Sequence, residues 1–364
     1  MGLSIVHVLS SFGVGGQERV ALDLAIGQRA RGHTVRAVSL APPPDGAMAD
    51  EFREHGIETL RVAKRGGLDP TLVPRLVIAL RRLGAQIVHT HNPLPLIYGA
   101  PAAKLAGAHA IHSKHGKNPG SRGQKLLRRL AARFTDAFVA VSDTTLAQAR
   151  ELHDAPEAKL HEIANGILLD RYTPNAAARA EIRAELGLGE AAWVVGTVGR
   201  IDANKNQAML VRAMLPMLSR EIRLVIVGDG PARAEVEAAA NGSPYVTFTG
   251  RRMDVPRVIH AFDVFALSSI SEGLPLVVPE AMAAALPIVS TAVGGIPSVV
   301  DQDVTGLLVP VDEARFAVAL AALAADRSRA RAMGKAAREV ALTRYSADRM
   351  VEAYLALYTS ICER

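Results

Sequence analysis

The sequence predicts an α/β protein with two doubly wound halves, each a parallel sheet covered by helices on both faces. Three observations carry this prediction. Short apolar runs alternate with helical patterns from the start of the chain, the rhythm stops at Asn165–Asn175 (NGILLDRYTPN), and it begins again at Trp193. Such alternation is typical of parallel βαβ units. A chain of 364 residues is also too long for one ordinary core, so two domains are expected.

The first half holds β-branched or apolar runs of strand length, separated by longer segments with helical periodicity. Ala41–Gly46 (APPPDG) is expected to be a surface loop, because consecutive prolines fit neither element. The predicted strands are Leu3–Leu9, Thr34–Leu40, Ile57–Val62, Gln86–Thr90, Ala108–His112 and Ala137–Val141, and the predicted helices are Gln17–Ala30, Thr71–Leu83, Pro95–Ala106, Gly123–Phe134 and Thr144–Leu152.

Asn-Gly and Thr-Pro are turn dipeptides, so the linker between the halves is placed at Asn165–Asn175. After it the alternation resumes, and the tail Ser328–Ile361 is expected to be helical and to pack back across the linker. The predicted strands are Trp193–Val198, Arg223–Val227, Tyr245–Phe248, Asp263–Leu267, Pro287–Ser290 and Leu307–Val309, and the predicted helices are Gln207–Leu218, Ala232–Ala240, Pro256–Phe262, Pro275–Ala285 and Glu313–Ala324.

Composition narrows the classes of protein. The single cysteine, Cys362, excludes a disulfide framework and a cysteine-based metal site, and it favours a reducing compartment. No apolar run approaches the length of a membrane span, and MGLSIVHVLS lacks the basic region of a signal peptide. Residues 1–172 contain 22 Lys and Arg against 15 Asp and Glu, a balance of +7, whereas the remainder is near neutral. An anionic partner of the first half is therefore expected.

The stretch Ser268–Pro287 (SSISEGLPLVVPEAMAAALP) indicates a site. Pro279 belongs in the first turn of a helix, where its missing N–H costs nothing, so the helix is predicted to begin near Leu276. The free amides of Leu276 and Val277 would then suit an anion such as a phosphate. Glu272 in the loop and Glu280 in the first turn would both lie at the carboxyl edge of the sheet, where open α/β folds bind ligands. Either glutamate alone is more simply a solvated or dipole-complementing side chain, and it is the pair that favours a site.

Two glycine-rich turns follow strands. Gly13–Gly16 opens the first helix, but Glu18 occupies the last glycine position of a dinucleotide fingerprint, and the Gly228–Gly230 turn fails likewise at Arg233. Both are interpreted as glycine turns at the mouth of a cleft. For each motif taken singly, a structural turn that binds no ligand explains the sequence equally well.

Cations and histidines also follow strands. Arg200 and Lys205, in GRIDANKNQ after Gly199, are placed to neutralise a diphosphate, although alone they read as a solvated loop. His89 and His91 would share a face of their strand without acidic partners, so a zinc site is not expected. His115, just past a strand end, is the histidine best placed to touch a ligand.

Two further patterns have plainer interpretations. Asp301–Asp303 resembles a D-x-D metal motif, but a turn explains it better. Gln124–Arg133 (QKLLRRLAAR) is a basic amphipathic helix, read as a surface helix with its apolar stripe on the core, and a membrane-surface contact is the alternative. Few aromatic residues (4%) argue against a nucleic-acid platform.

Taken together, these motifs resemble the family-4 retaining glycosyltransferases of the GT-B fold. The E-x₇-E segment from Glu272 to Glu280 is the most specific of them, and Ser298 and Pro279 depart from the usual pattern of the family. The matching motifs occur in order along most of the chain: GGQER at Gly15–Arg19, HG at His115, NGI at Asn165, GR and K at Gly199–Lys205, GDGP at Gly228–Pro231, SEGLPLVVPEAM at Ser271–Met282, VGGIP at Val293–Pro297 and TGLLVP at Thr305–Pro310.

The resemblance implies two Rossmann-like domains with a cleft between them: an acceptor-side domain at 1–168, a domain at 169–344 that binds a nucleotide sugar, and a C-terminal helix at 345–364 that crosses back to the first domain. It implies no metal and no cofactor, with a UDP- or GDP-sugar as the expected donor substrate. Arg200 and Lys205 would bind the diphosphate, together with backbone at Gly16, Leu276 and Val277. Four more residues, Gly199, Gly273, Leu274 and Pro275, would also contact the donor. Glu280 would bind the ribose, Glu272 and His115 the donor sugar, and Gly228, Gly230 and Arg251 would border the base.

The expected function is retaining transfer of a sugar from a nucleotide sugar to a glycan, a lipid-linked acceptor or a small molecule. A sugar-nucleotide 2-epimerase of similar fold is the alternative; a glycosidase would leave Arg200 and Lys205 without a role, and a non-catalytic sensor would bind donor without turnover. The protein is expected in the cytoplasm, with peripheral contact to the inner membrane surface through the basic first half. The loops Ala41–Gly46 and Gly116–Gly123 are expected to contact the acceptor, whose identity, like that of the nucleotide, the sugar and the oligomeric state, stays open.

Overall fold

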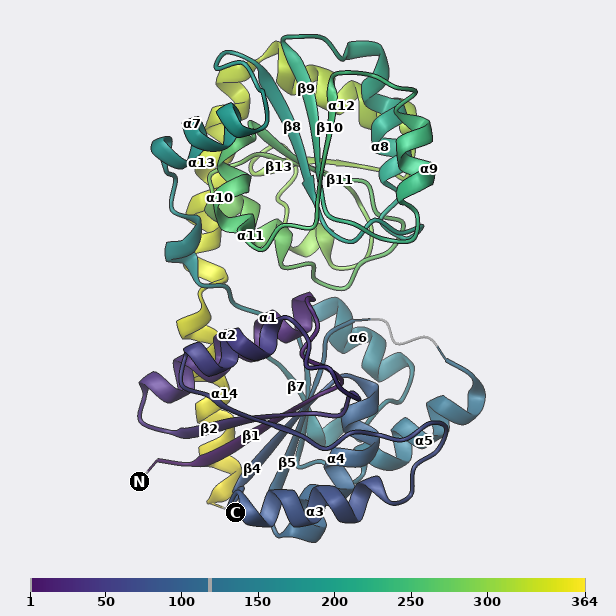
Figure 1. The fold of residues 1–364 in the computed structure, drawn as a ribbon, viewed down its shortest axis with the longest axis vertical. Coiled ribbons are helices and arrows are strands. Elements are labelled where there is room, and N and C mark those ends of the chain that lie inside the picture. Colours follow the sequence, from purple (N-terminus) through teal and green to yellow (C-terminus); the bar gives the residue numbers. More distant parts are fainter. Residues whose placement is uncertain (1, 117–119, 364) are drawn as a thin grey trace. The chain divides into compact units, whose positions relative to one another are not determined.

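The computed structural model describes residues 2–116 and 120–363. Contacts within the chain divide it into two compact units (Figure 1). The N-terminal unit comprises the residues up to Gly166 together with those from Ala347 onward, and the C-terminal unit is Ile167–Ser346. Each unit is built around its own parallel sheet, so the prediction of two doubly wound α/β halves is confirmed.

The sheet of the N-terminal unit has seven parallel strands in the order β3-β2-β1-β4-β5-β6-β7. The order reverses between β1 and β4, which are neighbours although two other strands separate them in the chain. Such a switch point leaves a crevice at the carboxyl ends of the strands. The strands are β1 (Ser4–Leu9), β2 (Thr34–Ser39), β3 (Glu58–Arg61), β4 (Ile87–His91), β5 (His109–Lys114), β6 (Ala137–Ala140) and β7 (Leu160–Glu162).

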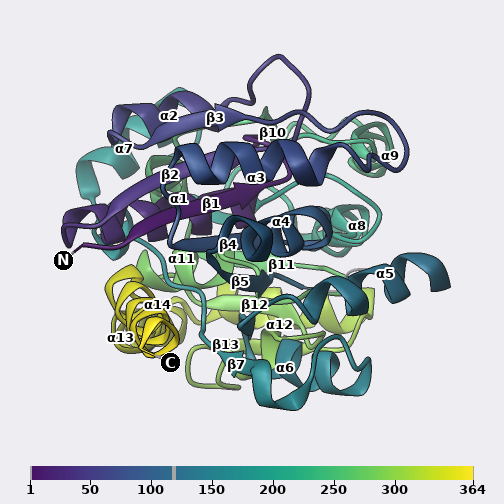
Figure 2. The ribbon, with the colours of Figure 1, turned by 90° about the horizontal axis from the view of Figure 1, so that it is seen from below.

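Helices cover both faces of this sheet (Figure 1), since both faces of the strands are apolar. On one face, α1 (Gly16–Ala30) and α2 (Met48–Glu54) enclose a core around Leu22 and Phe52. On the other face, α3 (Leu72–Arg82) and α4 (Pro93–Ala106) enclose a second core, and Figure 2 looks onto the side of these two helices. The remaining helices of the unit are α5 (Arg122–Ala132), α6 (Asp143–Glu151) and α14 (Ala347–Cys362).

Helix α14 comes from the end of the chain and packs against α1. The two helices approach closely at Gly27, where an added Cβ would lie 2.5 Å from a methyl carbon of Val351. The buried residues of α14 include Tyr354 and Tyr358. The expectation that the C-terminal helix returns to the first domain is therefore confirmed.

The C-terminal unit repeats the architecture with six parallel strands in the order β10-β9-β8-β11-β12-β13, and its switch point lies between β8 and β11. The strands are β8 (Trp193–Val198), β9 (Ile222–Val227), β10 (Val246–Gly250), β11 (Val264–Leu267), β12 (Ile288–Thr291) and β13 (Gly306–Val309). The helices are α7 (Ala176–Glu185), α8 (Gln207–Met214), α9 (Arg233–Ala239), α10 (Val255–Val258), α11 (Val277–Ala283), α12 (Glu313–Ala325) and α13 (Arg327–Arg344).

Three elements are absent from the sequence-based expectation. Helices α2 and α7 and strand β7 were not predicted. The tail is helical, as expected, and Tyr345 and Ser346 separate its two helices, α13 and α14. These two residues pair with Ile167 instead: its N–H donates to the Tyr345 carbonyl at 2.8 Å, and Ser346 forms a β-bridge with it.

Within the described residues, no helix combines the length and apolarity that crossing a bilayer would require.

Candidate functional site

Four loops meet at the carboxyl ends of the strands around the switch point of the C-terminal unit. They follow β8, β9, β11 and β12. Backbone hydrogen bonds tie them together: the N–H of Ile270 donates to the Asn204 carbonyl at 2.7 Å, that of Ile201 to Asp229 at 3.0 Å, and that of Gly295 to Gly273 at 2.9 Å. The loops therefore form one connected edge, which fixes the side chains that they carry.

Lys205 and Glu272 are in direct contact on this edge. Nζ of Lys205 lies 2.6 Å from Oε1 of Glu272, and the side chains are 19% and 9% exposed. Ser269 donates its hydroxyl to the same Oε1 at 2.5 Å. The Glu272 carboxylate is therefore fixed by two partners, and the structure unites two residues that the sequence motifs singled out separately.

Glycine is required at three points where these loops cross. Gly228 has φ +139°, and an added Cβ would lie 1.9 Å from the Gly199 carbonyl oxygen. Gly294 has φ +56°, and a Cβ there would lie 1.9 Å from the Glu272 carbonyl oxygen. At Gly230 the obstacle would be the Ile201 carbonyl, 2.2 Å away. A side chain at any of them would push the loops apart.

Helix α11 begins at Val277, with Leu276 at its N-cap, one residue from the predicted start. The first backbone hydrogen bonds of the helix are donated by the N–H groups of Val278 and Glu280. The N–H groups of Leu276 and Val277 lie before the first of these donors, at the N-terminal end of the helix. Glu280 is 9% exposed. At seven residues the helix is shorter than the predicted Pro275–Ala285, because Ala285 adopts a left-handed φ of +58°. The segment that leads into this helix contains the buried Leu274 and, next to it, Pro275.

Arg200 and Arg251 are more exposed than Lys205. The Arg200 side chain is 71% exposed, and its Nε lies 3.8 Å from Oδ2 of Asp202. Arg251 is exposed just after β10. Both follow strands that end on the same edge of the sheet, so a ligand could reach either cation at little desolvation cost.

Gly16 and His115 belong to the N-terminal unit, at the carboxyl ends of β1 and β5. Gly16 is the first residue of α1, and Gly15 is its N-cap. Glu18, in the first turn, is 4% exposed and accepts a hydrogen bond from Gln17; burial raises the pKa of its carboxyl group. His115 is half-buried, and residues 117–119 of the loop that follows lie outside the described residues.

Four histidines of this unit form a network with two residues from helices. The Nε2 atom of His115 lies 3.0 Å from Nδ1 of His91, and Nε2 of His91 lies 2.9 Å from Nδ1 of His7. From His7 the contacts continue to the Gln28 side chain on α1. His89 bonds to Ser113 on β5 and to Tyr358 on α14.

Burial keeps these histidines neutral. Desolvation lowers the pKa of His7 and of His115 to about 4, and it lowers those of His89 and His91 well below the usual value. The sequence motifs identified His89, His91 and His115 but not His7. Its signal was a histidine inside the apolar run SIVHVL, and parallel pairing places His7 opposite His89.

The ligand atoms of His7, His89 and His91 lie within 4.8 Å of one another, a spacing that a metal ion could use. All three residues are histidines, and their rings already exchange hydrogen bonds with neighbours. A metal would have to break these bonds, and the group brings no carboxylate to balance its charge. The geometry therefore suits a hydrogen-bonded network better than a metal centre.

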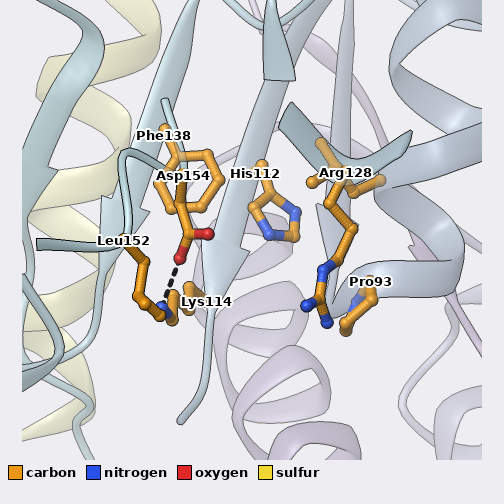
Figure 3. Close-up of a pocket in the computed structure, with 8 residues that line it drawn as sticks. Pro93, His112, Lys114, Arg128, Phe138, Leu152 and Asp154 are labelled. Atoms are coloured by element: carbon orange, nitrogen blue, oxygen red, sulfur yellow. Dashed lines mark hydrogen bonds and ion pairs between the residues drawn. The ribbon is translucent and has the colours of Figure 1, made fainter. Parts of the chain in front are cut away.

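A small pocket of about 20 Å³ lies elsewhere in the N-terminal unit (Figure 3). The buried Lys114 forms an ion pair with Asp154 at 2.5 Å in its wall. His112 lines the pocket and bonds to Thr90 at 3.0 Å. Such a volume holds one or two water molecules, not a sugar ring.

The D-x-D motif forms a turn, as expected. Asp303 adopts φ +63° and pairs with Arg329, while the N–H of Thr305 donates to the Asp301 carbonyl at 2.9 Å. The basic helix α5 differs from its expected packing. Leu126 and Leu130 are 57% and 44% exposed, so part of its apolar stripe faces solvent rather than the core.

Comparison with known proteins gives consistent results for both units. Residues 14–171 match the family model described as Glycosyltransferase Family 4, and residues 192–326 match the one described as Glycosyl transferases group 1. The chain is 36% identical over 346 residues to the GDP-mannose-dependent alpha-(1-6)-phosphatidylinositol monomannoside mannosyltransferase of Mycobacterium tuberculosis, covering 86% of each chain. It is 29% identical over 348 residues to a GDP-mannose-dependent alpha-mannosyltransferase of the same species, covering 90% of each. Its fold is similar to that of HepE from Anabaena, crystallised with UDP and glucose (TM-score 0.89, 21% identity, 98% and 100% of the two chains).

Proposed function

Because this chain belongs to the family-4 glycosyltransferases of the GT-B fold, we propose that it transfers mannose from GDP-mannose, with retention of configuration, to a hydroxyl group of an anionic, lipid-linked acceptor. The observation that carries the proposal is the 36% identity to a GDP-mannose-dependent enzyme over 86% of both chains. A second relative, also GDP-mannose-dependent, supports the same donor. These relatives are named transferases, so the epimerase alternative is not retained.

The donor's phosphates need positive charge where the leaving group forms. Lys205 and Arg200 supply it, and the amides of Leu276 and Val277 add donors beside them. Their help grows as the sugar–phosphate bond breaks and the diphosphate gains charge, which lowers the barrier. Displacement of Lys205 from Glu272 by the phosphates would free that carboxylate for hydroxyl groups of the sugar.

The remaining predicted residues divide the rest of the donor between them. Glu280 binds the ribose hydroxyls, and Gly228, Gly230 and Arg251 border the base. The glycine turns have no side chains at Gly228 and Gly230, so the base can approach their backbone closely. On the N-terminal unit, Gly16 offers backbone to the diphosphate and His115 contacts the sugar near its reacting carbon. The bond from the anomeric carbon to phosphate oxygen breaks, the bond to the acceptor oxygen forms on the same face, and the departing phosphate takes the acceptor's proton.

The acceptor proposal rests on α5 and its surroundings. The helix places exposed Leu126 and Leu130 among arginines and a lysine, and Phe134 just beyond it is 47% exposed. An apolar stripe edged with cations is the pattern of a helix that lies on an anionic lipid surface. The relative named for a phosphatidylinositol monomannoside acts on an acceptor of that chemistry. We therefore place the lipid contact of this chain at α5.

A donor screen tests the first half of the proposal. GDP-mannose should raise the melting temperature of the protein more than UDP-glucose at equal concentration, because a ligand specific for the native state stabilises it by mass action. Labelled mannose should then move from GDP-mannose to a phosphatidylinositol mannoside in vesicles, and NMR of the product should give the α anomer. Stabilisation by UDP-glucose alone would overturn the donor, and transfer only to free inositol 3-phosphate would overturn the lipid acceptor.

Vesicle sedimentation tests the α5 contact. The wild-type protein should sediment with vesicles containing phosphatidylinositol, and the double variant Leu126→Gln/Leu130→Gln should lose most of that binding without losing stability. Val318→Gln is the matched control, because Val318 is 70% exposed on α12 of the other unit. Equal binding by the double variant and the control would place the lipid contact elsewhere.

A further inference from the structure

The histidine network of the N-terminal unit has one open end. Each ring nitrogen of His7 and of His91 has a hydrogen-bond partner. His115 uses only Nε2, while its Nδ1 is buried and has no partner among the described residues. A buried polar atom left unpaired costs free energy, so its presence at the end of an ordered chain calls for an explanation.

We propose that Gln28, His7 and His91 act as a relay of positioning residues that holds His115 in a single tautomer, with the proton on Nε2 and a lone pair on Nδ1 for a substrate hydroxyl. The role of that hydroxyl rests on the proposed function, because His115 is assigned there to the donor sugar. The relay itself rests on the order of donors and acceptors in the hydrogen bonds that run from Gln28 through His7 and His91 to His115.

The direction of the relay is set by the Gln28 amide. Its Oε1 lies 2.9 Å from Nε2 of His7 and can only accept, so the proton of His7 is on Nε2. Nδ1 of the neutral His7 ring must then accept, which places the proton of His91 on Nε2. The same step at the next contact places the proton of His115 on Nε2 and leaves its Nδ1 as an acceptor.

Helix α14 supplies the partner for the other end of the amide. Nε2 of Gln28 lies 3.3 Å from the Tyr358 hydroxyl, and that hydroxyl lies 2.7 Å from Nδ1 of His89. With Gln28 donating to Tyr358, Tyr358 donates to His89, and His89 donates from Nε2 to Ser113 at 2.7 Å. Every bond then has one donor and one acceptor. Rotating the amide by half a turn would reverse all of these bonds and put a proton on His115 Nδ1.

Tyr354 provides a matched comparison on the same helix. Its hydroxyl lies 2.6 Å from Oγ of Ser113, at the far end of the branch through His89, and both tyrosines are buried. Replacing either residue by phenylalanine removes one buried hydroxyl. Only the Tyr358 hydroxyl touches Gln28, so only its loss should release the amide and the relay.

The test is nitrogen NMR of the full-length protein labelled at the histidine rings, at neutral pH, with His115 assigned by the loss of its signals in His115→Gln. The expected spectrum shows His115 protonated at Nε2 and unprotonated at Nδ1. A proton on Nδ1, or a mixture of tautomers, in the wild-type protein would overturn the relay. A stoichiometric zinc ion bound by the purified protein at His7 and His91 would overturn it as well.

Two variants then connect the relay with turnover. Tyr358→Phe should give a tautomer mixture at His115 and a kcat lower by about tenfold, the equivalent of roughly one hydrogen bond, with little change in the KM for GDP-mannose. Tyr354→Phe should keep both the tautomer and kcat. Equal effects of the two variants on the tautomer would reduce Tyr358 to a structural role. If the tautomer is found as expected but no mannose is transferred, the proposed function fails and the relay stands.

Discussion

Nζ of Lys205 and Oε1 of Glu272 lie 2.6 Å apart, although the two residues are 67 positions apart in the chain. The contact joins the loop after β8 to the loop after β11, the two strands at the switch point. The protein thus holds a cation and an anion in contact at the place where open α/β sheets take their ligands.

Lys205→Ala should lower kcat by about 10²- to 10³-fold, the usual effect of removing one preorganised partner of a developing charge. Steady-state kinetics with GDP-mannose measures it. Arg212→Ala is the control, because Arg212 lies in the same unit and forms an exposed pair with Glu313. If Lys205→Ala turned over as fast as this control, Lys205 would have no part in stabilising the leaving group.

Gly294→Ala should destabilise the C-terminal unit and separate the loops of the site. The added Cβ would meet the Glu272 carbonyl oxygen at 1.9 Å, and φ at this position is +56°. The expected loss is roughly 1–3 kcal/mol of unfolding free energy together with weaker donor binding. Denaturant titration and calorimetry measure the two effects. Gly187→Ala, with a similar φ of +62° but open space around the Cβ, isolates the cost of the backbone conformation.

Stability should fall as the pH is lowered from about 6.5 towards 4. Burial lowers the pKa of His7 and His115 to about 4 and that of His112 to about 3, whereas the unfolded chain takes up these protons near pH 6.5. The unfolded state therefore binds more protons in this window, so each histidine lowers the unfolding free energy by up to about 1.4 kcal/mol per pH unit as the pH falls. Glu18, whose pKa burial raises, acts in the opposite sense.

Denaturant titrations at several pH values measure this slope. The variant His112→Asn should have a shallower dependence by about one proton, because it removes one buried, neutral imidazole outside the relay. A flat profile between pH 6.5 and 4, in the wild-type protein, would mean that these histidines are not neutralised by burial.

Local patterns predicted most of the architecture but not the contacts that depend on tertiary pairing. Trp193–Val198 was predicted with its observed bounds, because a buried parallel strand is a continuous apolar run. Helix α7 was missed because turn dipeptides just before it suggested a linker, although Asn175 caps it by accepting from the Ala178 N–H. The lesson is that a capping residue inside a turn-rich stretch can mark a helix start.

The residues of the two candidate sites also differ in how far the sequence could indicate them. The segment around Glu272 was singled out because its residues are close together in the sequence, and Lys205, which the structure places in contact with Glu272, was expected on the same edge. Gln28 and Tyr358 carry no such signal: each stands in an ordinary amphipathic helix, and their contact spans 330 positions. Only the return of α14 to α1 brings them together, and periodicity gives no information about which helix faces which.

That return also determines when the N-terminal unit can be finished during synthesis. Its first 166 residues leave the ribosome well before α14, since all of Ile167–Ser346 is made in between. Until then Gln28 and His89 lack their Tyr358 partner, and the flank of α1 that α14 covers is open to water. The N-terminal unit therefore cannot complete its fold until α14 has been synthesised. A chain whose synthesis stops before α14 would have an incomplete histidine network.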